Sequence, residues 1–398
     1  MTVLNIAIAV DGLSEHWLGG VNYFRNLVTV FDAAADPGLR LHLLTDESGF
    51  FNDLHPSPRV MLHALGMLKR KSPAWVLRKA LVLATGRDTQ LLAQLKHHDV
   101  RAVLFKYVEG ASAAGIPTLP WIPDFQFKHL PELFPPSVVD ALQRKVQLYI
   151  RHADGLILSS QAACDDAVSL FGADRRKLHV LRFAPKVDFK PLQLAALRDE
   201  VFARHGIARP YVFLPNQYWQ HKNHQLVVQA LKLLRDEGRP APLIVSTGKT
   251  EDPRTPAYFT EFEAGVRAQG LTADYRILGV IPRQDMLVLL AHSLAVLNPS
   301  RFKGWSTTVE EAKSLGKPLL VSNIAVHREQ VAGRGDALCF GTDDASALAA
   351  QLEGLARRHA SDAATSHPPW PDPSLHTVFM TQNIALLRTV VSAHKVAV

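Results

Sequence analysis

The chain has 398 residues, of which 47% are hydrophobic and 20% are charged. A single hydrophobic core rarely grows beyond about 250–300 residues, so this length predicts two domains, and the composition excludes a largely disordered chain. The net charge of +7 suits phosphate-bearing substrates, an anionic membrane surface or nucleic acid. Nucleic acid is the least favoured of the three, because no zinc-finger, helix-turn-helix or RNA-binding-sheet signature accompanies the charge.

The cysteines and the first residues indicate a compartment. Cys164 and Cys339 match no metal or redox spacing, so we expect two ordinary buried thiols in a reducing cytosol of bacterial type. The apolar run 1–10 stops at Asp11 without a basic leader, which predicts a buried strand rather than a signal peptide. No apolar run reaches the ~18 residues of a spanning helix. We therefore expect a cytoplasmic protein, soluble or peripheral on the inner face of the plasma membrane.

Short β-branched runs alternate with helical stretches in the first half, which is typical of parallel sheets covered by helices. The clearest helices are expected over Gly20 to Ala35 and over Val138 to Ala153, where Val139, Leu142, Val146 and Tyr149 share one face. Strands are expected at Leu4 to Val10, Arg40 to Thr45, Ala102 to Phe105, Leu119 to Ile122, Gly155 to Ser159 and Leu178 to Arg182.

The alternation pauses at Phe183 to Pro191 and then resumes, so we predict domains at 1–188 and 189–373. A proline-rich stretch precedes an amphipathic helix over 374–398, which we expect to pack on the first domain. Second-half strands are expected at Tyr211 to Leu214, Leu243 to Thr247, Tyr275 to Leu278, Ala295 to Asn298, Pro318 to Ser322 and Ala337 to Phe340. Helices are expected at Asn223 to Glu237, Tyr258 to Gln269, Arg283 to Ala291, Ser306 to Leu315 and Asp344 to His359.

The predicted fold is therefore α/β, with two tandem Rossmann-like doubly wound domains. Ligands of such sheets bind at the carboxyl ends of the strands, so we expect the site in an interdomain cleft.

Three segments carry candidate chemistry. Gly19-Gly20 opens a helix after the first strand, where its backbone can approach an anion or simply make a tight turn. The Gly19-Gly20 segment lacks the glycine spacing of a dinucleotide-binding fingerprint.

The second segment contains Lys222, which follows the first strand of the second half, just before a helix. It is either a solvated lysine or a diphosphate ligand. The opposing helix dipole favours a bound anion.

The third segment, 297–318, is the most informative. A strand ends at Asn298, a loop follows, and Ser306 or Thr307 caps a helix whose free N–H groups can hold a departing diphosphate. Glu310 is expected to complete a capping box from Thr307. Glu311 is then left over, as a surface carboxylate or as an acceptor for a ribose diol.

These residues resemble the retaining GT-B glycosyltransferases of family 4 over most of the chain. The resemblance rests on Gly19-Gly20 in the first half, on the Pro-Asp element in Trp121 to Leu130, and on Lys222-Asn223. It rests most specifically on Glu311-Ala312 and Gly316-Lys317-Pro318, which match the second half of the family's paired-glutamate signature. Such a protein uses a nucleotide diphosphate sugar as donor and usually needs no metal.

The resemblance implies that Lys222 contacts the diphosphate, Glu311 the ribose, and the backbone of Trp305 to Thr308 the phosphate and sugar. Two positions depart from the family. Lys303 stands where the first glutamate is usual, and Gln217 stands where an arginine is common. The predicted donor contacts are Gly19, Gly20, Asn216, Gln217, Lys222, Gly304, Trp305, Ser306, Thr307, Thr308 and Glu311.

Retention in this fold is usually attributed to front-face attack, in which the departing phosphate takes the acceptor's proton. The absence of a Ser/His/Asp or Cys/His constellation agrees with a reaction that has no protein nucleophile. Candidate catalytic residues are Lys222, Lys303, Glu311 and Asp124; Asp124 and His129 are acceptor-side candidates or loop residues with local hydrogen bonds. No paired-aspartate or His-rich spacing suggests a metal, so we expect none.

Residues 67–83 contain five basic residues, Trp75 and several aliphatic residues, without an acid. They form either an anionic-membrane surface that receives a lipid-linked acceptor or a packed helix with a solvated basic face. The expected function is sugar transfer to a hydroxyl of a polysaccharide or lipid-linked glycan. A catalytically silent nucleotide- or glycan-binding scaffold is the alternative that Lys303 suggests. An epimerase or phosphorylase is disfavoured, since a catalytic acid set and a cofactor lysine are missing.

Overall fold

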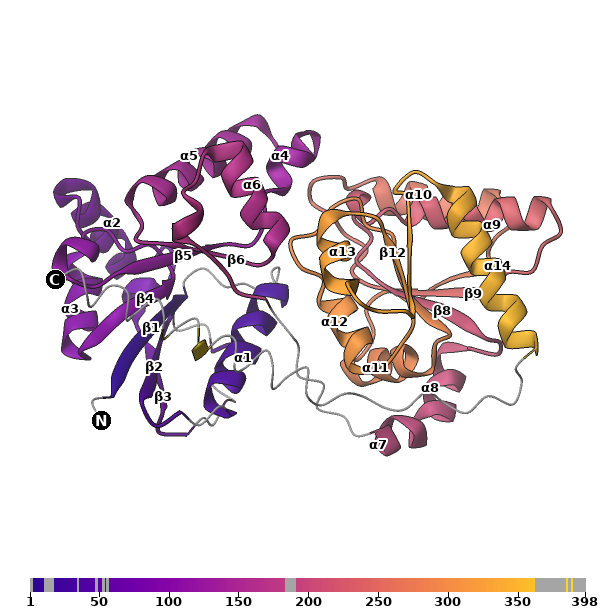
Figure 1. The fold of residues 1–398 in the computed structure, drawn as a ribbon, viewed down its shortest axis with the longest axis horizontal. Helices are drawn as coiled ribbons and strands as arrows, with labels where there is room; N and C mark the ends of the chain where they lie inside the picture. The colour runs from indigo at the N-terminus through magenta and orange to yellow at the C-terminus, as the bar shows by residue number, and fades with distance from the viewer. Residues whose placement is uncertain are drawn as a thin grey trace. The chain divides into compact units, whose positions relative to one another are not determined.

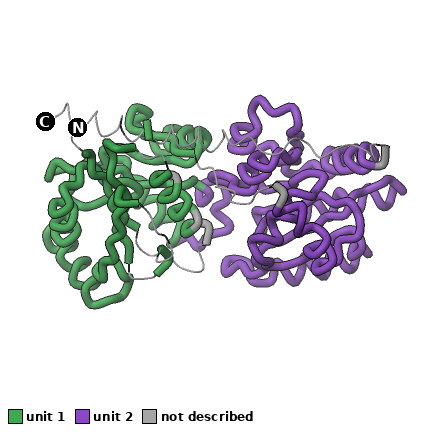
Figure 2. The backbone as a smooth tube through the Cα atoms, turned by 90° about the horizontal axis from the view of Figure 1, so that it is seen from below, with its two compact units in different colours: residues 1–125, 137–185, 376–398 green, residues 126–136, 186–375 purple. Residues whose placement is uncertain are grey.

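The structure is a computed structural model that describes residues 3–10, 18–33, 36–46, 49–51, 54, 57–182, 191–361, 384–385 and 388. The chain divides into two compact units (Figure 2): unit 1 holds 1–125, 137–185 and 376–398, and unit 2 holds 126–136 and 186–375. The predicted domain boundary at 188 lies outside the described residues, as does nearly all of the predicted helix 374–398. Arg388, which is described, forms an ion pair with Asp36.

Unit 1 is built on a seven-stranded parallel sheet of order β3-β2-β1-β4-β5-β6-β7 (Figure 1). Its strands are β1 (Leu4–Val10), β2 (Leu39–Thr45), β3 (Val60–Ala64), β4 (Val100–Phe105), β5 (Thr118–Ile122), β6 (Leu156–Leu158) and β7 (Leu178–Val180). Its helices are α1 (Leu18–Ala33), α2 (Pro73–Thr85), α3 (Thr89–His97), α5 (Pro136–His152, whose first residue belongs to unit 2) and α6 (Gln161–Phe171). Short 3-10 turns are η2 (Gly66–Leu68), η3 (Ser112–Ala114) and η5 (Arg175–Lys177).

Unit 2 is built on a six-stranded parallel sheet of order β10-β9-β8-β11-β12-β13. Its strands are β8 (Tyr211–Pro215), β9 (Leu243–Thr247), β10 (Tyr275–Ile277), β11 (Ala295–Asn298), β12 (Leu319–Ser322) and β13 (Ala337–Phe340). Its helices are α4 (Gln126–His129), α7 (Pro191–Ala196), α8 (Arg198–His205), α9 (His224–Asp236), α10 (Tyr258–Ala268), α11 (Arg283–His292), α12 (Thr307–Ser314), α13 (Ala325–Val331) and α14 (Ala345–Ser361), with turns η4 (Pro131–Leu133) and η6 (Gln220–Lys222).

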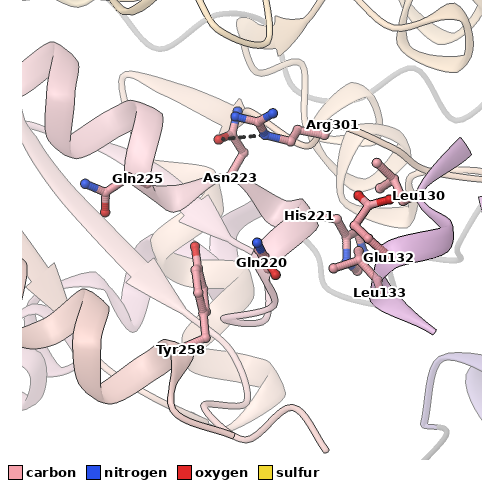
Figure 3. Close-up of a pocket in the computed structure, with 9 residues that line it drawn as sticks. All are labelled: Leu130, Glu132, Leu133, Gln220, His221, Asn223, Gln225, Tyr258 and Arg301. Atoms are coloured by element: carbon pink, nitrogen blue, oxygen red, sulfur yellow. Dashed lines mark hydrogen bonds between the residues drawn. The ribbon is translucent and has the colours of Figure 1, made fainter. Parts of the chain in front are cut away.

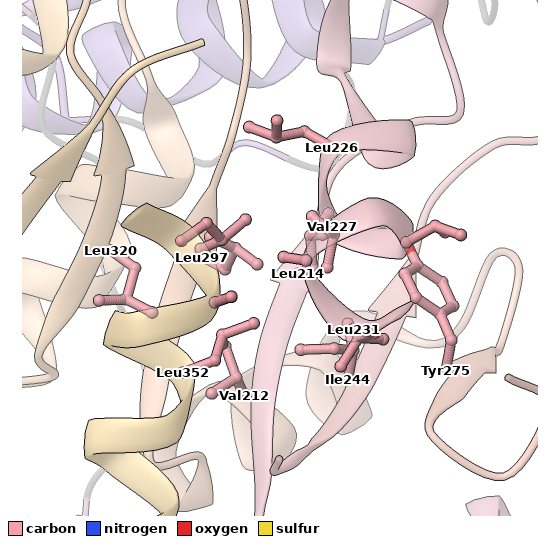
Figure 4. Close-up of a cluster of buried hydrophobic side chains, with 14 of the residues drawn as sticks. Val212, Leu214, Leu226, Val227, Leu231, Ile244, Tyr275, Leu297, Leu320 and Leu352 are labelled. Carbon is pink, nitrogen blue, oxygen red and sulfur yellow. The ribbon is translucent and has the colours of Figure 1, made fainter. Parts of the chain in front are cut away.

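The sheet of unit 2 is covered on both faces, which explains why β8 is apolar at successive positions. Val212 and Leu214 face a core that includes α9, α10 and α14 (Figure 4). Tyr211 and Phe213 face the opposite core, formed with α7, α8, α11, α12 and α13. Because successive side chains of a strand point to opposite faces, this one strand stabilises both layers. The predicted doubly wound α/β architecture is therefore confirmed.

Capping residues in the sequence determine both ends of α2. The Ser72 side chain accepts a hydrogen bond from the Trp75 amide at the start of α2, Pro73 occupies the first helical position, and Gly86 ends the helix with φ of 67°. These signals define a folded helix over part of the basic segment 67–83.

Two local expectations, those for Cys339 and Glu310, need correction. Cys339 is exposed, because it lies on the edge strand β13, whereas Cys164 is buried as predicted. The predicted helix over Val138 to Ala153 is present as α5, in which Val146 is buried and Val139, Leu142 and Tyr149 are half-buried. Glu310 does not form the capping box: Ser306 is the N-cap and bonds the Val309 amide. Glu310 instead accepts from Gln330 at 2.8 Å and pairs with Lys313 at 2.9 Å.

Candidate functional site

The candidate site lies where the strand order of unit 2 reverses, between β8 and β11. These strands are neighbours in the sheet, but the chain leaves them toward opposite sides. Loops that follow two such strands diverge and leave a crevice at the carboxyl edge, which is where doubly wound sheets bind ligands. The loop after β8 carries Asn216 and Lys222, and the loop after β11 carries Lys303. The fold thus brings together two of the three segments predicted from the sequence.

Buried amide and hydroxyl groups connect the two loops. Asn216 donates to the Asn298 side-chain oxygen at 3.2 Å, and Asn298 donates to the Ser306 hydroxyl at 2.8 Å. Ser300 also donates to Asn298, at 2.7 Å. The Thr308 hydroxyl reaches back to the Pro215 carbonyl at 3.3 Å. Since every link is buried or half-buried, the network holds the start of α12 in register with the end of β8.

Asn223 fixes the turn that carries Lys222. It has φ of 61°, a left-handed conformation that is uncommon for residues other than glycine. Its side-chain amide donates to the carbonyls of Pro299 at 3.2 Å and Thr342 at 2.8 Å. The Arg301 amide donates to the His221 carbonyl at 2.8 Å. These bonds hold the turn in a backbone conformation of the kind that clusters at functional sites.

Gly248 is required beside the same loop. A Cβ at this position would lie 2.5 Å from the Asn216 carbonyl oxygen, and the residue has φ of 150°. A larger residue would push the Asn216 backbone out of place.

The two lysines of the site differ in their surroundings. Lys222 is 8% exposed, and its Nζ lies 5.7 Å from the centre of the Trp219 ring. Lys303 lies beside Lys222 and donates to Asn216 Oδ1 at 3.3 Å. Burial lowers the pKa of Lys303 to about 8, although the Glu311 carboxylate acts in the opposite direction. Two cations gathered in one partly buried place can attract an anion with more than one charge.

Glu311 is buried but is not a spare carboxylate in this state. Its Oε1 lies 2.6 Å from an Arg283 nitrogen. Arg283 could not be predicted as a site residue, because it comes from α11 and lies far from Glu311 along the chain. A carboxylate has two oxygens and about four acceptor positions, so the ion pair with Arg283 leaves acceptor capacity for a ligand.

Two buried histidines of the site were missed by sequence reasoning. Burial, followed by the charges of Lys222, Arg254 and Lys303, lowers the pKa of His221 far below its usual range. Burial and the charges of Lys303 and Lys222 lower the pKa of His327 to about 3. Both rings are therefore neutral at pH 7, because burial and, to a smaller extent, the nearby cations disfavour their charged forms.

The hydrogen bonds of His327 determine its tautomer. The Ser322 hydroxyl lies 2.5 Å from the Ser300 carbonyl and must donate its proton there. His327 Nδ1 lies 3.0 Å from both the hydroxyl and the carbonyl of Ser322, so Nδ1 carries the proton. Nε2 is then an acceptor, buried and without a hydrogen-bond partner among the described residues. It can accept a hydrogen bond from a ligand hydroxyl that reaches it.

A cavity of about 350 Å³ adjoins the turn before α9 (Figure 3). His221 and Arg301 contribute polar atoms, and Leu130 and Leu133 contribute an apolar side from the segment 126–136, which belongs to unit 2. The lining residues are Leu130, Glu132, Leu133, Gln220, His221, Asn223, Gln225, Tyr258 and Arg301.

The remaining predicted residues are distributed as follows. The ring of His129 lies 5.1 Å, centre to centre, from that of Phe302, so this acceptor-side candidate borders the loop that carries Lys303. Gly19, Gly20 and Asp124 belong to unit 1. Gly19 and Gly20 fall in the first turn of α1. Gln217, Gly304 and Trp305 are half-buried in unit 2, whereas Thr307 is exposed at the start of α12.

Comparison with known proteins shows that this site lies in a segment that matches a protein-family model. Residues 198–363 match the family model "Glycosyl transferases group 1", so unit 2 carries a group 1 glycosyltransferase domain. The chain is 25% identical over 226 residues to the O-antigen chain mannosyltransferase B of Escherichia coli. That match covers 56% of this chain and 56% of the mannosyltransferase, so it spans about half of the curated relative's length.

Solved structures share the whole architecture. A glycosyltransferase from Rickettsia africae superposes with a TM-score of 0.67 at 14% identity, over 99% of this chain and 98% of the other. Anabaena HepE, solved with UDP and glucose, gives 0.67 at 16% identity, over 98% of this chain and 100% of the other. WaaG, a glycosyltransferase involved in lipopolysaccharide biosynthesis, gives 0.53 at 14% identity, over 89% and 95%. At such low identity the likeness concerns the fold, which is GT-B.

Proposed function

We propose that this protein transfers a sugar from a nucleotide diphosphate sugar to a hydroxyl of a polysaccharide or lipid-linked glycan, with retention of the anomeric configuration. One observation carries the proposal: Lys222, which is buried, and Lys303, which is half-buried, lie together just before α9 and α12, where the strand order reverses in a domain that matches the group 1 model. Lysine ammonium groups and a helix N-terminus both attract the diphosphate that such a reaction releases.

The proposed donor is held from its two ends. The ammonium groups of Lys222 and Lys303 neutralise the diphosphate, and the backbone of Trp305 to Thr308 contacts its oxygens through N–H groups other than that of Ser306, which donates to Gln330 Oε1 at 3.2 Å. The Glu311 carboxylate accepts from the ribose hydroxyls through the capacity that Arg283 leaves. Gly19 and Gly20, in unit 1, stay predicted backbone contacts of the donor. This arrangement stabilises the leaving group more in the transition state, where negative charge develops, than in the bound donor.

The proposed reaction needs no protein nucleophile. The bond between the anomeric carbon and the diphosphate oxygen breaks, and the acceptor oxygen bonds the same face of that carbon. The acceptor's proton passes to the departing phosphate. Asp124 and His129 are proposed to orient the acceptor, and no metal ion is invoked, since the lysines and the helix supply the positive charge.

We place the protein in the cytoplasm and at the inner face of the plasma membrane. Helix α2 exposes Val76, Leu77 and Leu83, which are 54%, 55% and 89% exposed. The exposed residues Lys69, Arg70 and Lys71 precede it. Apolar side chains beside basic ones suit the boundary of an anionic leaflet. In the part of the chain that the structure describes, no helix is both long and apolar enough to cross a bilayer.

The test is incubation with a panel of nucleotide sugars. A transferase should slowly release free nucleoside diphosphate even without acceptor, and Lys222→Ala should abolish this release. Lys232→Ala is the matched control, because Lys232 lies on the exposed side of α9 and pairs with Asp236 at 2.5 Å. Equal loss in both variants would contradict the assigned site.

A second candidate is a silent nucleotide- or glycan-binding scaffold. Lys303 motivates it, since a cation stands where the resembled family has a glutamate. Tight nucleotide binding without turnover, under any acceptor tested, would favour this candidate over transfer.

A further inference from the structure

Three histidines that are far apart in sequence meet in unit 1, outside the site described above. His42 lies in β2, His63 in β3, and His98 directly follows α3. In the sheet register Leu44 is the partner of His63, and His42 lies two residues before Leu44. His42 and His63 therefore project from the same face. One ring nitrogen from each of the three residues lies within 4.8 Å of the other two.

The rings are arranged as ligands rather than as a loose surface cluster. His42 Nδ1 lies 3.1 Å from His63 Nε2. Two imidazole nitrogens that bind the same tetrahedral zinc ion, each at about 2.0–2.1 Å, are separated by roughly 3.4 Å. The His98 ring centre lies 4.2 Å from that of His63 and 5.1 Å from that of His42. Small rotations of side chains already in contact would bring all three nitrogens to one ion.

Asn5 sets the tautomer of His42. The Asn5 side-chain nitrogen donates to the Asp99 carbonyl at 3.4 Å, which directs the amide oxygen of Asn5 toward His42. That oxygen lies 3.4 Å from His42 Nε2, so Nε2 carries the proton and donates it. The lone pair of Nδ1 then points at His63. Metal-bound histidines are commonly oriented in this way, through a hydrogen bond from the other ring nitrogen.

The rings are also in the chemical form that binds metal. Burial, followed by repulsion from His63, His98 and Arg40, lowers the pKa of His42 to about 4. Burial lowers the pKa of His63 and of His98 as well. Neutral imidazole is the ligand, so little proton competition is expected at pH 7.

We propose that His42, His63 and His98 form a binding site for a divalent transition-metal ion of the zinc type. Imidazole nitrogens suit zinc, cobalt, nickel and copper, whereas magnesium and calcium prefer oxygen ligands. Among the described residues, no carboxylate or thiolate joins the cluster, so water completes the coordination. In the metal-free protein one proton bridges His42 and His63. A bound metal ion occupies the position of this bridging proton, and the proton of the His63 ring then lies on Nδ1.

The site has a structural role that is separate from sugar transfer. It joins β2, β3 and the connection from α3 to β4, next to the core that includes Leu44, Leu92 and Val100. None of the three histidines is among the proposed donor or acceptor contacts. A bound ion therefore raises the melting temperature of the protein without being required for glycosyl transfer.

The experiment is a cobalt titration of the tag-free full-length protein, because Co²⁺ reports its coordination by visible absorption. We expect one Co²⁺ per chain, absorption bands of four- or five-coordinate cobalt, displacement by Zn²⁺ and a higher melting temperature with metal. His63→Gln and His98→Gln, at partly exposed positions, should each weaken binding at least tenfold. Asn5→Ala should weaken it by about 10- to 100-fold through the lost orientation of His42.

Controls separate this site from adventitious binding. His152→Gln, at an exposed position of α5, should leave binding unchanged. His97→Gln tests whether His97, whose ring centre lies 4.8 Å from that of His98, takes part in metal binding. Circular dichroism of each metal-free variant establishes that it folds. Absence of stoichiometric binding, or binding that survives both His63→Gln and His98→Gln in folded protein, overturns the proposal.

Discussion

Glu311 Oε1 lies 2.6 Å from an Arg283 nitrogen. Variants of the two residues can therefore separate the proposed role of Glu311 in ribose binding from its role in this ion pair. Glu311→Ala should weaken binding of the nucleoside diphosphate by ~1–3 kcal/mol, since hydrogen bonds to a charged group are lost. Isothermal titration calorimetry measures this loss. Arg283→Gln removes the same ion pair but keeps the carboxylate, and should cost less. Unchanged affinity of Glu311→Ala would exclude this residue from the nucleotide site.

Lys303 should make nucleotide binding depend on pH. Its pKa of about 8 in the free protein means that the ammonium is charged below pH 8 and loses its proton above it. A bound diphosphate favours the charged form and raises this pKa, so affinity should fall as pH rises from 8 toward 9.5. In Lys303→Arg the guanidinium stays charged, and the fall should disappear. A similar decline in that variant would assign the titration to another group.

Single residues show how far the sequence could predict the site. Lys222 and Ser306 were identifiable because each follows a strand and precedes a helix, a position that has direct chemical meaning. Arg283, His221 and His327 were not, because their roles depend on neighbours supplied by other elements. Glu310 was predicted as a cap partner from spacing alone, but Gln330, on α13, provides a buried hydrogen bond that spacing cannot reveal.

Helix α2 combines a structural arginine with an exposed surface. Arg78 is 1% exposed, and its Nε lies 2.8 Å from Asp88 Oδ2. Asp88 is also the N-cap of α3 and accepts from the Leu91 amide at 3.2 Å. Arg78→Ala should reduce the free energy of unfolding by ~3–5 kcal/mol, because a buried carboxylate loses its partner. Lys79→Ala, at the adjacent exposed position, should change it by less than ~0.5 kcal/mol. Urea unfolding compares the two, and equal stability would contradict the role of the pair.

The strands and helices that could be predicted from the sequence are those whose apolar residues recur at the regular spacing of a strand or a helix. All predicted strands of unit 2 are present, within one or two residues at each end. The missed strand β3 is largely exposed and alternates weakly, and the missed helix α13 has seven residues, too few for a helical period to stand out. Tertiary contacts with the sheets, rather than local propensity, stabilise such short elements.

At the scale of the molecule, the surface of α2 should attach the protein to anionic vesicles. Because Arg78 is buried in an ion pair, it is not part of this surface, and the test uses Lys69, Arg70, Lys71 and Lys79 alone. Replacing these four with Gln should abolish flotation with phosphatidylserine vesicles at physiological salt, while wild-type binding should weaken as salt increases. Neutral phosphatidylcholine vesicles provide the control. Flotation that is unchanged in the variant would exclude the surface as a membrane contact.

The parallel α/β architecture was predictable because strand and helix patterns alternate through both halves. The histidine cluster was not, since His42, His63 and His98 have no metal-binding spacing and meet only when β2, β3 and the end of α3 are assembled. Site chemistry that depends on sheet register cannot be read from spacing along the chain.

The segment 126–136 has a practical consequence for work on isolated parts of the chain. It belongs to unit 2, although unit 1 resumes after it, and it contributes Leu130 and Leu133 to the cavity wall. Phe134 also packs under Arg254, whose guanidinium carbon lies 5.6 Å from the ring centre. A gene fragment that begins near residue 186 would therefore lack one wall of its own pocket. Expression of unit 2 by itself requires this segment to be grafted back through a designed linker.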